Sequence, residues 1–182
     1  MFGDETNHPD NICYEKLGDI ATYINGAAFK PSDWGTEGLP IVRIQNLSGT
    51  GEAYNYYNGN YKPEVEITDG DILISWSATL GVYLWDKGKA LLNQHIFKVL
   101  FNKKPIDKYF FIYAVQQKLE SMKDKTHGST MTHIVKKDFD NTKIAYPSPT
   151  DQSKFANIVK QADKSKFQIS KLINLIPKTI EP

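Results

Sequence analysis

The sequence predicts a mixed α/β (α+β) fold, in which helices flank a twisted, mostly antiparallel sheet and a long coiled-coil helix follows at the C-terminus. Two observations lead to this class. Short runs of β-branched and aromatic residues, separated by Gly, Asn and Asp turns, fill the region 20–101. Beyond that region, apolar residues recur every three or four positions, which is the spacing of one helix face.

Strands are expected where apolar runs are bounded by turn residues. Asn25-Gly26 closes the first run, Gln45-Asn46 closes the second, and Asp69-Gly70-Asp71 introduces the third. A long irregular loop is expected at 54–61, and the last long run is expected to continue in one sheet across its polar interruption at 93–95. The expected strands are 20–24, 39–44, 72–76, 82–85, 91–101 and 143–146.

Two longer helices are expected, one after Pro105 and one after Pro149. Asp107 can cap the first, whose apolar residues between 111 and 122 recur at helical spacing and should pack on the sheet. Asp151 can cap the second. A short helical turn is expected at 133–139, between the two.

The last helix carries an apolar seam with the a and d spacing of a coiled coil, interrupted by Ser165. Pairing with a second helix is favoured over packing on the helix's own domain, because about 25 residues at 1.5 Å each are long for a small domain to cover. The predicted dimerisation residues are Phe155, Ile158, Ala162, Ile169, Leu172 and Ile176. The chain therefore divides into a globular domain at 1–149 and a spacer helix at 150–182.

Composition restricts the classes of protein. The longest apolar run is far shorter than the roughly 20 residues of a membrane span, and the polar, acidic N-terminus is unlike a signal peptide, so we expect a cytoplasmic protein with no membrane partner. The lone Cys13 agrees with a reducing compartment. Cys and His residues show no zinc-ligand spacing, so neither a metal site nor a resident cofactor is expected.

Charge is distributed unevenly along the chain. Residues 1–100 contain seven Lys or Arg against thirteen Asp or Glu, whereas residues 101–182 contain fifteen against eight. The basic half is a candidate for binding a polyanion such as DNA, and the acidic half for facing a basic protein. Lysines that only solvate a helix surface would give the same count.

Several side chains at strand ends have the hydrogen-bonding groups that read base edges. Arg suits guanine, Asn and Gln suit adenine, and small hydroxyl and methyl groups suit thymine. Structural roles stay open for each: an ion pair for the arginine, a turn for the hydroxyls beside a core Trp76, and simple solvent exposure for the polar triplet. The candidates are Arg43, Gln45, Asn46, Ser75, Ser77, Thr79, Asn93, Gln94 and His95.

A second group suits phosphate binding. Small hydroxyls at Ser129 and Thr130, after Gly128, can hold phosphate oxygens together with backbone amides, and Lys136 and Lys137 can neutralise the charge. No Gly-rich cofactor loop, P-loop or Asn-Pro-Pro-aromatic methylation motif is present in the sequence. We assign no catalytic residue.

Six segments, taken in order, resemble the specificity subunit of type I restriction-modification enzymes, with one target recognition domain and the helix that follows it. Together they span about four-fifths of the chain, and their shared order is more specific than any one of them. They are KLGDIATYINGAAF, LPIVRIQNL, GDILISWSATLG, LNQHIFKVL, GSTMTHIVKKDFDNTKIAYPSP and DQSKFANIVKQADKSKF.

The resemblance implies a non-catalytic subunit that reads one half of a bipartite target in double-stranded DNA. It also implies assembly with DNA adenine methyltransferase subunits and a restriction subunit, with S-adenosylmethionine, ATP and Mg²⁺ used only in the assembled complex. Members of the family normally carry two recognition domains and two helices, whereas this sequence has one of each. It is therefore either a half-size subunit that forms a homodimer through its C-terminal helix or a fragment of a longer protein.

Two other functions compete with this interpretation. A stand-alone carbohydrate-binding or surface-recognition module would use the tyrosines between 54 and 61 and the three tryptophans as stacking platforms. The lysine-rich second half and the coiled-coil seam argue against it. A toxin-like enzyme is disfavoured because the sequence shows no catalytic constellation.

Overall fold

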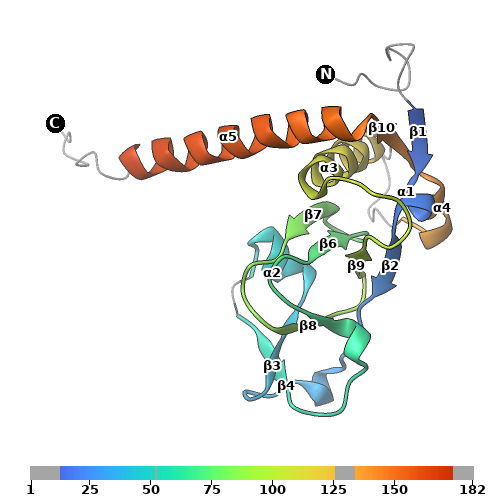
Figure 1. The fold of residues 1–182 in the computed structure, drawn as a ribbon. Coiled ribbons are helices and arrows are strands. Elements are labelled where there is room, and N and C mark those ends of the chain that lie inside the picture. The colour runs from blue at the N-terminus through green and yellow to red at the C-terminus, as the bar shows by residue number, and fades with distance from the viewer. Residues whose placement is uncertain (1–12, 52, 126–133, 174–182) are drawn as a thin grey trace.

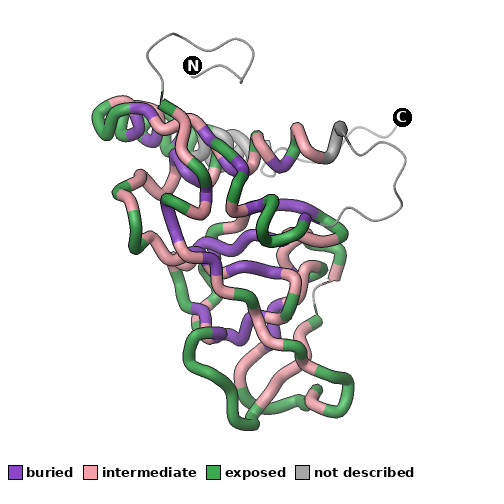
Figure 2. Tube along the Cα trace, turned by 90° about the vertical axis from the view of Figure 1, so that its right-hand side faces the viewer, coloured by how far each residue is buried: buried purple, intermediate pink, exposed green. Residues whose placement is uncertain are grey.

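The computed structural model describes residues 13–51, 53–125 and 134–173. Figure 1 shows an elongated body with helices at one end and a small β lobe at the other. The last helix, α5 (Pro149–Ile173), runs across the helical end and projects beyond the body. In Figure 2 the buried segments concentrate in the strands at the centre of the body, and the tip of the β lobe is exposed.

The central sheet has four strands, all joined to their neighbours antiparallel. A second four-stranded sheet lies below it and is antiparallel except for the pairing of β3 with β8, which is parallel. In the central sheet the strand order is β2 (Thr22–Asn25), β9 (Ile96–Leu100), β6 (Ile72–Ser75), β7 (Gly81–Leu84). In the second sheet the strand order is β4 (Asn55–Tyr57), β3 (Leu39–Val42), β8 (Ala90–Leu92), β5 (Glu66–Ile67).

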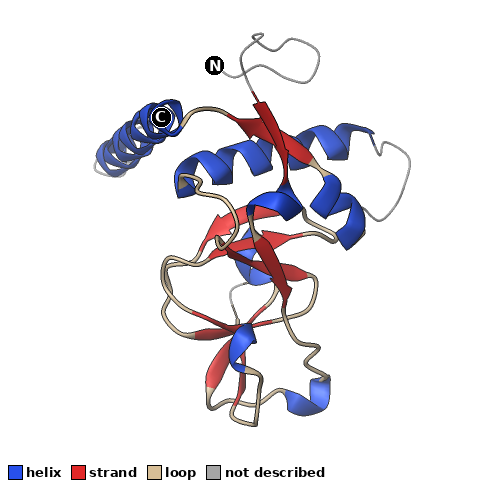
Figure 3. Ribbon diagram, turned by 45° about the vertical axis from the view of Figure 1, so that its right-hand side comes forward, coloured by secondary structure: helices blue, strands red, loops and turns tan. Residues whose placement is uncertain are grey.

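Helices cover one end of this arrangement (Figure 3), and β1 (Cys13–Lys16) pairs antiparallel with β10 (Lys143–Tyr146) beside them. The mixed α/β class and the mostly antiparallel pairing predicted from the sequence are confirmed. The shorter elements are α1 (Leu17–Ile20), α2 (Ile44–Ser48), α4 (Lys136–Asn141) and the 3₁₀ turns η1 (Pro31–Asp33) and η2 (Pro63–Val65). None of the helices in the described ranges is long and apolar enough to cross a membrane.

The core has two parts because successive side chains of a strand point to opposite faces of a sheet. On β6, Ile72 and Ile74 join the cluster under the helices, where they meet Phe111 and Val115 of α3 (Lys108–Lys125). Leu73, between them, points to the opposite face and joins the second cluster, which includes Val42 and Leu92 of the lower sheet. The central sheet is thus buried on both faces, which explains why β6 is fully apolar up to Ser75.

The expected strand over 91–101 is wrong as a single element. β8 and β9 belong to different sheets, and the polar triplet between them is the connection. His95 has φ +70°, a left-handed conformation that is uncommon for residues other than glycine. The triplet therefore turns the chain from one sheet into the other, a role that polar residues fit because turns need local hydrogen bonds.

Several other element boundaries differ from the sequence prediction. Ile20 lies in α1, so the strand expected at 20–24 is β2 and begins at Thr22. The second strand ends at Val42, because Asn46 Oδ1 accepts a hydrogen bond from the Arg43 amide (2.9 Å) and starts the short helix α2. The loop expected at 54–61 contains the strand β4.

The two long helices begin with different caps. Asp107 caps α3 as predicted, since its carboxylate accepts hydrogen bonds from the amides of Tyr109 (2.8 Å) and Phe110 (3.1 Å). The predicted cap of α5 is wrong: Ser148 is the capping residue, and its hydroxyl accepts from the Asp151 amide (3.2 Å) while donating to the Asp151 carboxylate (2.8 Å). Pro149 fits the first helical position, where no amide donor is needed.

The first turns of α5 are fixed to the globular domain. Gln152 is buried, accepts a hydrogen bond from the Asp107 amide (2.9 Å) and donates one to the Pro147 carbonyl (2.9 Å). Ala156 and Val159 continue this buried stripe. Phe155 packs edge-on against Phe110 of α3, with 5.7 Å between ring centroids. The start of the predicted spacer helix therefore belongs to the domain core.

The predicted seam lies beside the buried stripe, and its next residues point to solvent. Ile158 is 52% exposed, and Ala162 and Ser165 are exposed. The predicted seam residues Ile169 and Leu172 lie on α5, but their side chains are outside the described part of the chain, and Ile176 lies outside the described residues altogether. Pairing of α5 with another helix stays a prediction.

Candidate nucleic-acid interface

The parallel pairing of β3 and β8 brings two candidate segments to one sheet edge. Val42 pairs with Leu92, and the Asn93 amide donates to the Val42 carbonyl (3.0 Å). Arg43 and Asn93, which follow these strands, therefore leave the sheet side by side, although 50 residues separate them in the sequence. An antiparallel pairing would have placed them at opposite ends of the sheet.

The end of β6 joins the same region. Ser75 pairs with Ile96, and the Trp76 amide donates to the His95 carbonyl (3.2 Å). The Trp76 carbonyl in turn accepts a hydrogen bond from the Ile134 amide (3.0 Å), just before α4. Three segments that were singled out separately in the sequence, at 43–46, 75–79 and 93–95, are thus linked through main-chain contacts, and the last contact leads to α4 with Lys136 and Lys137.

Aromatic rings form the base of this region. The Trp76 ring stacks on Phe97 with 5.5 Å between centroids and meets the His95 ring edge-on at 5.0 Å. Lys136 Nζ lies 5.9 Å from the ring centroids of Phe97 and Tyr23. Tyr23 donates to the Leu17 carbonyl (3.0 Å), and burial, with a smaller contribution from the charge of Asp140, raises the pKa of its hydroxyl. Tyr23 therefore stays neutral and structural.

The outer surface of the region is polar. Gln45, Thr79, Gln94 and Lys137 are exposed, and Arg43, Ser77, Asn93 and His95 are partly buried. Lys136 pairs with Asp140 one helical turn later, with 2.7 Å between Nζ and Oδ2. Lys137 has the more accessible charge, because the Lys136 charge is shared with this carboxylate.

Two predicted base-contacting residues have structural roles instead. Asn46 is buried; its Oδ1 accepts from the Arg43 amide, and its Nδ2 donates to the carbonyls of Gly51 (3.1 Å) and Ala53 (3.0 Å). Ser75 is fully buried and donates to the Thr79 carbonyl. Neither presents a group outward, so both are removed from the candidate interface. Ser129 and Thr130 lie outside the described residues.

The alternative role of Arg43 was an ion pair. No carboxylate among the described residues forms one with it. Its guanidinium carbon lies 4.9 Å from the centroid of the Trp34 ring, and its Nε is buried without a hydrogen-bond partner among the described residues. Trp34 was not predicted to be part of a DNA interface, because no local pattern in the sequence links it to a residue nine positions later. An exposed tryptophan before a Gly-rich turn is the only signal that could have identified it.

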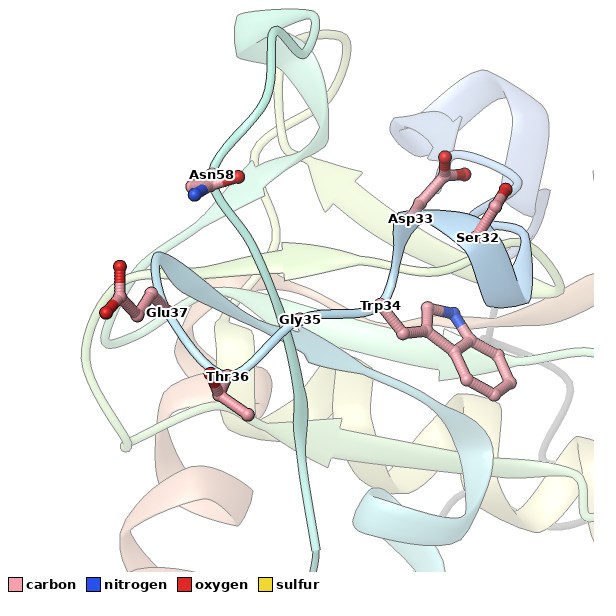
Figure 4. Close-up of a pocket in the computed structure, with 7 residues that line it drawn as sticks. All are labelled: Ser32, Asp33, Trp34, Gly35, Thr36, Glu37 and Asn58. Atoms are coloured by element: carbon pink, nitrogen blue, oxygen red, sulfur yellow. The ribbon is translucent and has the colours of Figure 1, made fainter.

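A shallow depression lies beside Trp34 and is shown in Figure 4. Its lining is mostly polar and includes two carboxylates, Asp33 and Glu37. Asp33 is engaged locally, since its Oδ2 accepts from the Lys30 amide (2.7 Å). In Figure 4 the Trp34 indole points away from Glu37, so the ring and this carboxylate lie on different sides of the segment.

The tyrosine-rich segment does not form an open stacking platform. Tyr54 packs against the lower core, and Tyr57 packs on Phe29 with 5.1 Å between ring centroids. Tyr61 donates to the Glu66 carboxylate (2.9 Å). Within the described part of the chain, no group of three or more His, Cys, Asp or Glu could hold a metal ion.

Comparison with known proteins identifies the family. The type I restriction modification DNA specificity domain matches residues 9–178. The MjaVIII specificity subunit of a type I restriction enzyme from Methanocaldococcus jannaschii is 28% identical over 174 residues, which are 93% of this chain and 40% of that protein. The putative MjaX specificity subunit of the same organism is 27% identical over 156 residues, 81% of this chain and 37% of that protein.

Solved structures share the fold. The HsdS subunit of Thermoanaerobacter tengcongensis superposes with a TM-score of 0.65 at 18% identity, covering 97% of this chain and 43% of that one. The type I S subunit of M. genitalium gives a TM-score of 0.63 at 17% identity, covering 92% and 43%. The chain thus spans about two-fifths of the relatives that it matches. It belongs to the family of type I restriction-modification DNA specificity domains.

Proposed function

We propose that this chain is the DNA-reading part of a type I specificity subunit and that it binds one half of a bipartite target in double-stranded DNA. The observation that carries the proposal is that the segments after β3, β8 and β6 and the start of α4 are joined by main-chain hydrogen bonds, from Asn93 to Val42, from Trp76 to His95 and from Ile134 to Trp76. Arg43, Asn93 and Gln94 follow strands whose ends are fixed by main-chain hydrogen bonds. Side chains held in this way can present donors and acceptors to base edges in a groove.

Phosphate contacts supply the affinity in this proposal. Lys136 and Lys137 border the region on α4. Ser129 and Thr130, the other predicted phosphate-binding residues, precede them in the sequence and lie outside the described residues. Neutralising phosphates releases counterions from DNA, so binding should weaken steeply with salt. The chain itself performs no chemistry in this proposal.

The remaining roles follow from family membership and stay proposals. The recognition domain is residues 1–149, and the helix at 150–182 sets the spacing to a second recognition domain. Adenine methyltransferase and restriction subunits assemble on it in the cytoplasm and use S-adenosylmethionine, ATP and Mg²⁺. Recovery of an adenine methyltransferase with the tagged chain from its native cell would support the assembly; recovery of the chain alone would count against it.

The salt dependence of DNA binding tests the electrostatic part. We expect the logarithm of the association constant to fall linearly with the logarithm of salt concentration, and Lys137→Ala to reduce the slope by about one. Lys154→Ala is the matched control, because Lys154 is an exposed lysine on α5 that pairs with Asp151 (3.3 Å). Fluorescence anisotropy with labelled duplex DNA measures both. A flat salt response of the unmodified chain would contradict the proposal.

The pairing role of α5 is tested by Ile158→Asp. Ile158 is 52% exposed and contributes little to its own domain, so the substitution should leave folding intact while placing a charge in the seam. We expect light scattering to report a dimer for the unmodified chain and a monomer for the variant. Asn157→Asp adds the same charge at an exposed neighbouring position and should leave the mass unchanged. An unchanged mass for Ile158→Asp would exclude this seam as the contact.

A further inference from the structure

We infer that Trp34 is a positioning residue for Arg43, and that the Arg43–Trp34 pair selects a G·C base pair at one position of the recognised half-site. The inference rests on the proposed function and extends it to a named base pair. Its starting point is the guanidinium of Arg43, which lies over the Trp34 ring at 4.9 Å.

The backbone of Arg43 is fixed on both sides. Before it, β3 is paired with β8 on one edge and with β4 on the other. After it, the Arg43 amide donates to Asn46 Oδ1 (2.9 Å), and the Arg43 carbonyl accepts from the Asn46 amide (2.9 Å). Asn46 is itself held by the carbonyls of Gly51 and Ala53. The remaining conformational freedom of the guanidinium therefore comes from the side-chain torsions alone.

Trp34 restricts that side chain. An arginine has four flexible side-chain torsions, and stacking on an aromatic face limits the orientation of its planar guanidinium. Stacking uses the face of the group and hydrogen bonding uses its edge, so the ring does not compete for the in-plane donors; because Nε is buried, the two terminal nitrogens are the donors that remain for a bidentate contact. None of the described carboxylates pairs with Arg43, so the positive charge is not already neutralised by them.

The chemistry of the guanidinium edge indicates guanine. Two parallel N–H donors of a guanidinium match the O6 and N7 acceptors of guanine in the major groove, and no other base edge there offers two acceptors. Trp34 is 39% exposed and comes from the segment after η1, whereas Asn93 approaches from the end of β8. The Arg43 side chain thus has an aromatic support that is independent of the polar turn beside it.

The test is selection of binding sites from a pool of duplexes with a randomised central segment, using the full chain with its co-purifying subunits. We expect the unmodified protein to enrich guanine at one position that Arg43→Lys loses, because a lysine cannot make the bidentate contact. Trp34→Leu should lower the preference for guanine at that same position by about tenfold, within the range of one bidentate contact, and leave the other positions unchanged. Trp34→Phe should restore most of it.

Three results would overturn the inference, and they are distinguishable. Unchanged preferences in Trp34→Leu, or an equal loss at every position, would show that Trp34 has only a structural role or none. A guanine preference that survives Arg43→Lys would assign the contact to another residue. Absence of any enriched sequence for the folded, unmodified complex would reject the proposed function itself and the inference with it.

Discussion

Phe97→Ala is expected to lower the free energy of unfolding by about 3–5 kcal/mol. Phe97 is fully buried on β9 and contacts the rings of Tyr23, Trp76 and Phe139, with centroid distances of 5.9, 5.5 and 5.3 Å. Removing the ring leaves a cavity between the sheet and the helices that rigid strands cannot close. A loss of this size is a large part of the about 5–15 kcal/mol that stabilises a typical domain.

Urea unfolding followed by tryptophan fluorescence measures this effect, since Trp76 stacks directly on the deleted ring. The control is Leu84→Ala on β7, where the side chain is 40% exposed and the change should stay within about 0.5 kcal/mol. DNA binding should fail together with stability, because Phe97 supports Trp76 and the turn at His95. A change under about 1 kcal/mol in Phe97→Ala would mean that this core is packed differently.

Gly26→Ala is expected to destabilise the domain by about 3 kcal/mol and to weaken DNA binding even where the protein remains folded. A Cβ at residue 26 would lie 2.1 Å from the Asn93 carbonyl oxygen and 2.3 Å from that of Leu92. Both obstacles are backbone atoms, so no side chain can move aside. Relief requires the segment after β2 to separate from the turn that carries Asn93.

Gly35→Ala is the matched control, because a Cβ there meets its nearest heavy atom at 3.7 Å, an ordinary contact. Its free energy of unfolding should change by about 0.5 kcal/mol or less. Chemical denaturation gives the stability of both variants, and anisotropy at a temperature where both are folded gives the affinity. Equal behaviour of the two variants would contradict the close approach of Gly26 to the turn.

The sequence predicted most strands and both long helices because their signals are local. The cap at Asp107 and the turn at Gly70, which has φ +89°, depend on neighbouring residues alone. The sequence also identified Asn25-Gly26 as a boundary, but for the wrong reason. An Asn-Gly pair predicts a turn because glycine accepts a positive φ, but Gly26 does not have a positive φ and is instead required by the close backbone contact with Leu92 and Asn93.

The errors arise where distant segments decide the outcome. Whether β8 and β9 share a sheet depends on β3 pairing with β8, a contact between residues 50 positions apart that no short window contains. The candidate site was only partly predicted for the same reason. Polar residues at strand ends were recognisable, but the inward roles of Asn46 and Ser75, and the stacking of Trp34 on Arg43, are set by tertiary packing.

The turn at Asn93–His95 includes a side-chain hydrogen bond, from the Gln94 amide to Asn93 Oδ1 (2.8 Å). Further hydrogen bonds of this turn join main-chain atoms: the Asn93 amide to Val42, the Gln94 amide to Ala27 and the His95 carbonyl to Trp76. Every amino acid except proline supplies these groups. The side chain at 94 can therefore vary without loss of these main-chain bonds, whereas position 95, at φ +70°, favours Gly, Asn, Asp or His. If the chain reads DNA as proposed, exchange of a few surface residues such as Gln94 changes the recognised DNA sequence while the fold is kept.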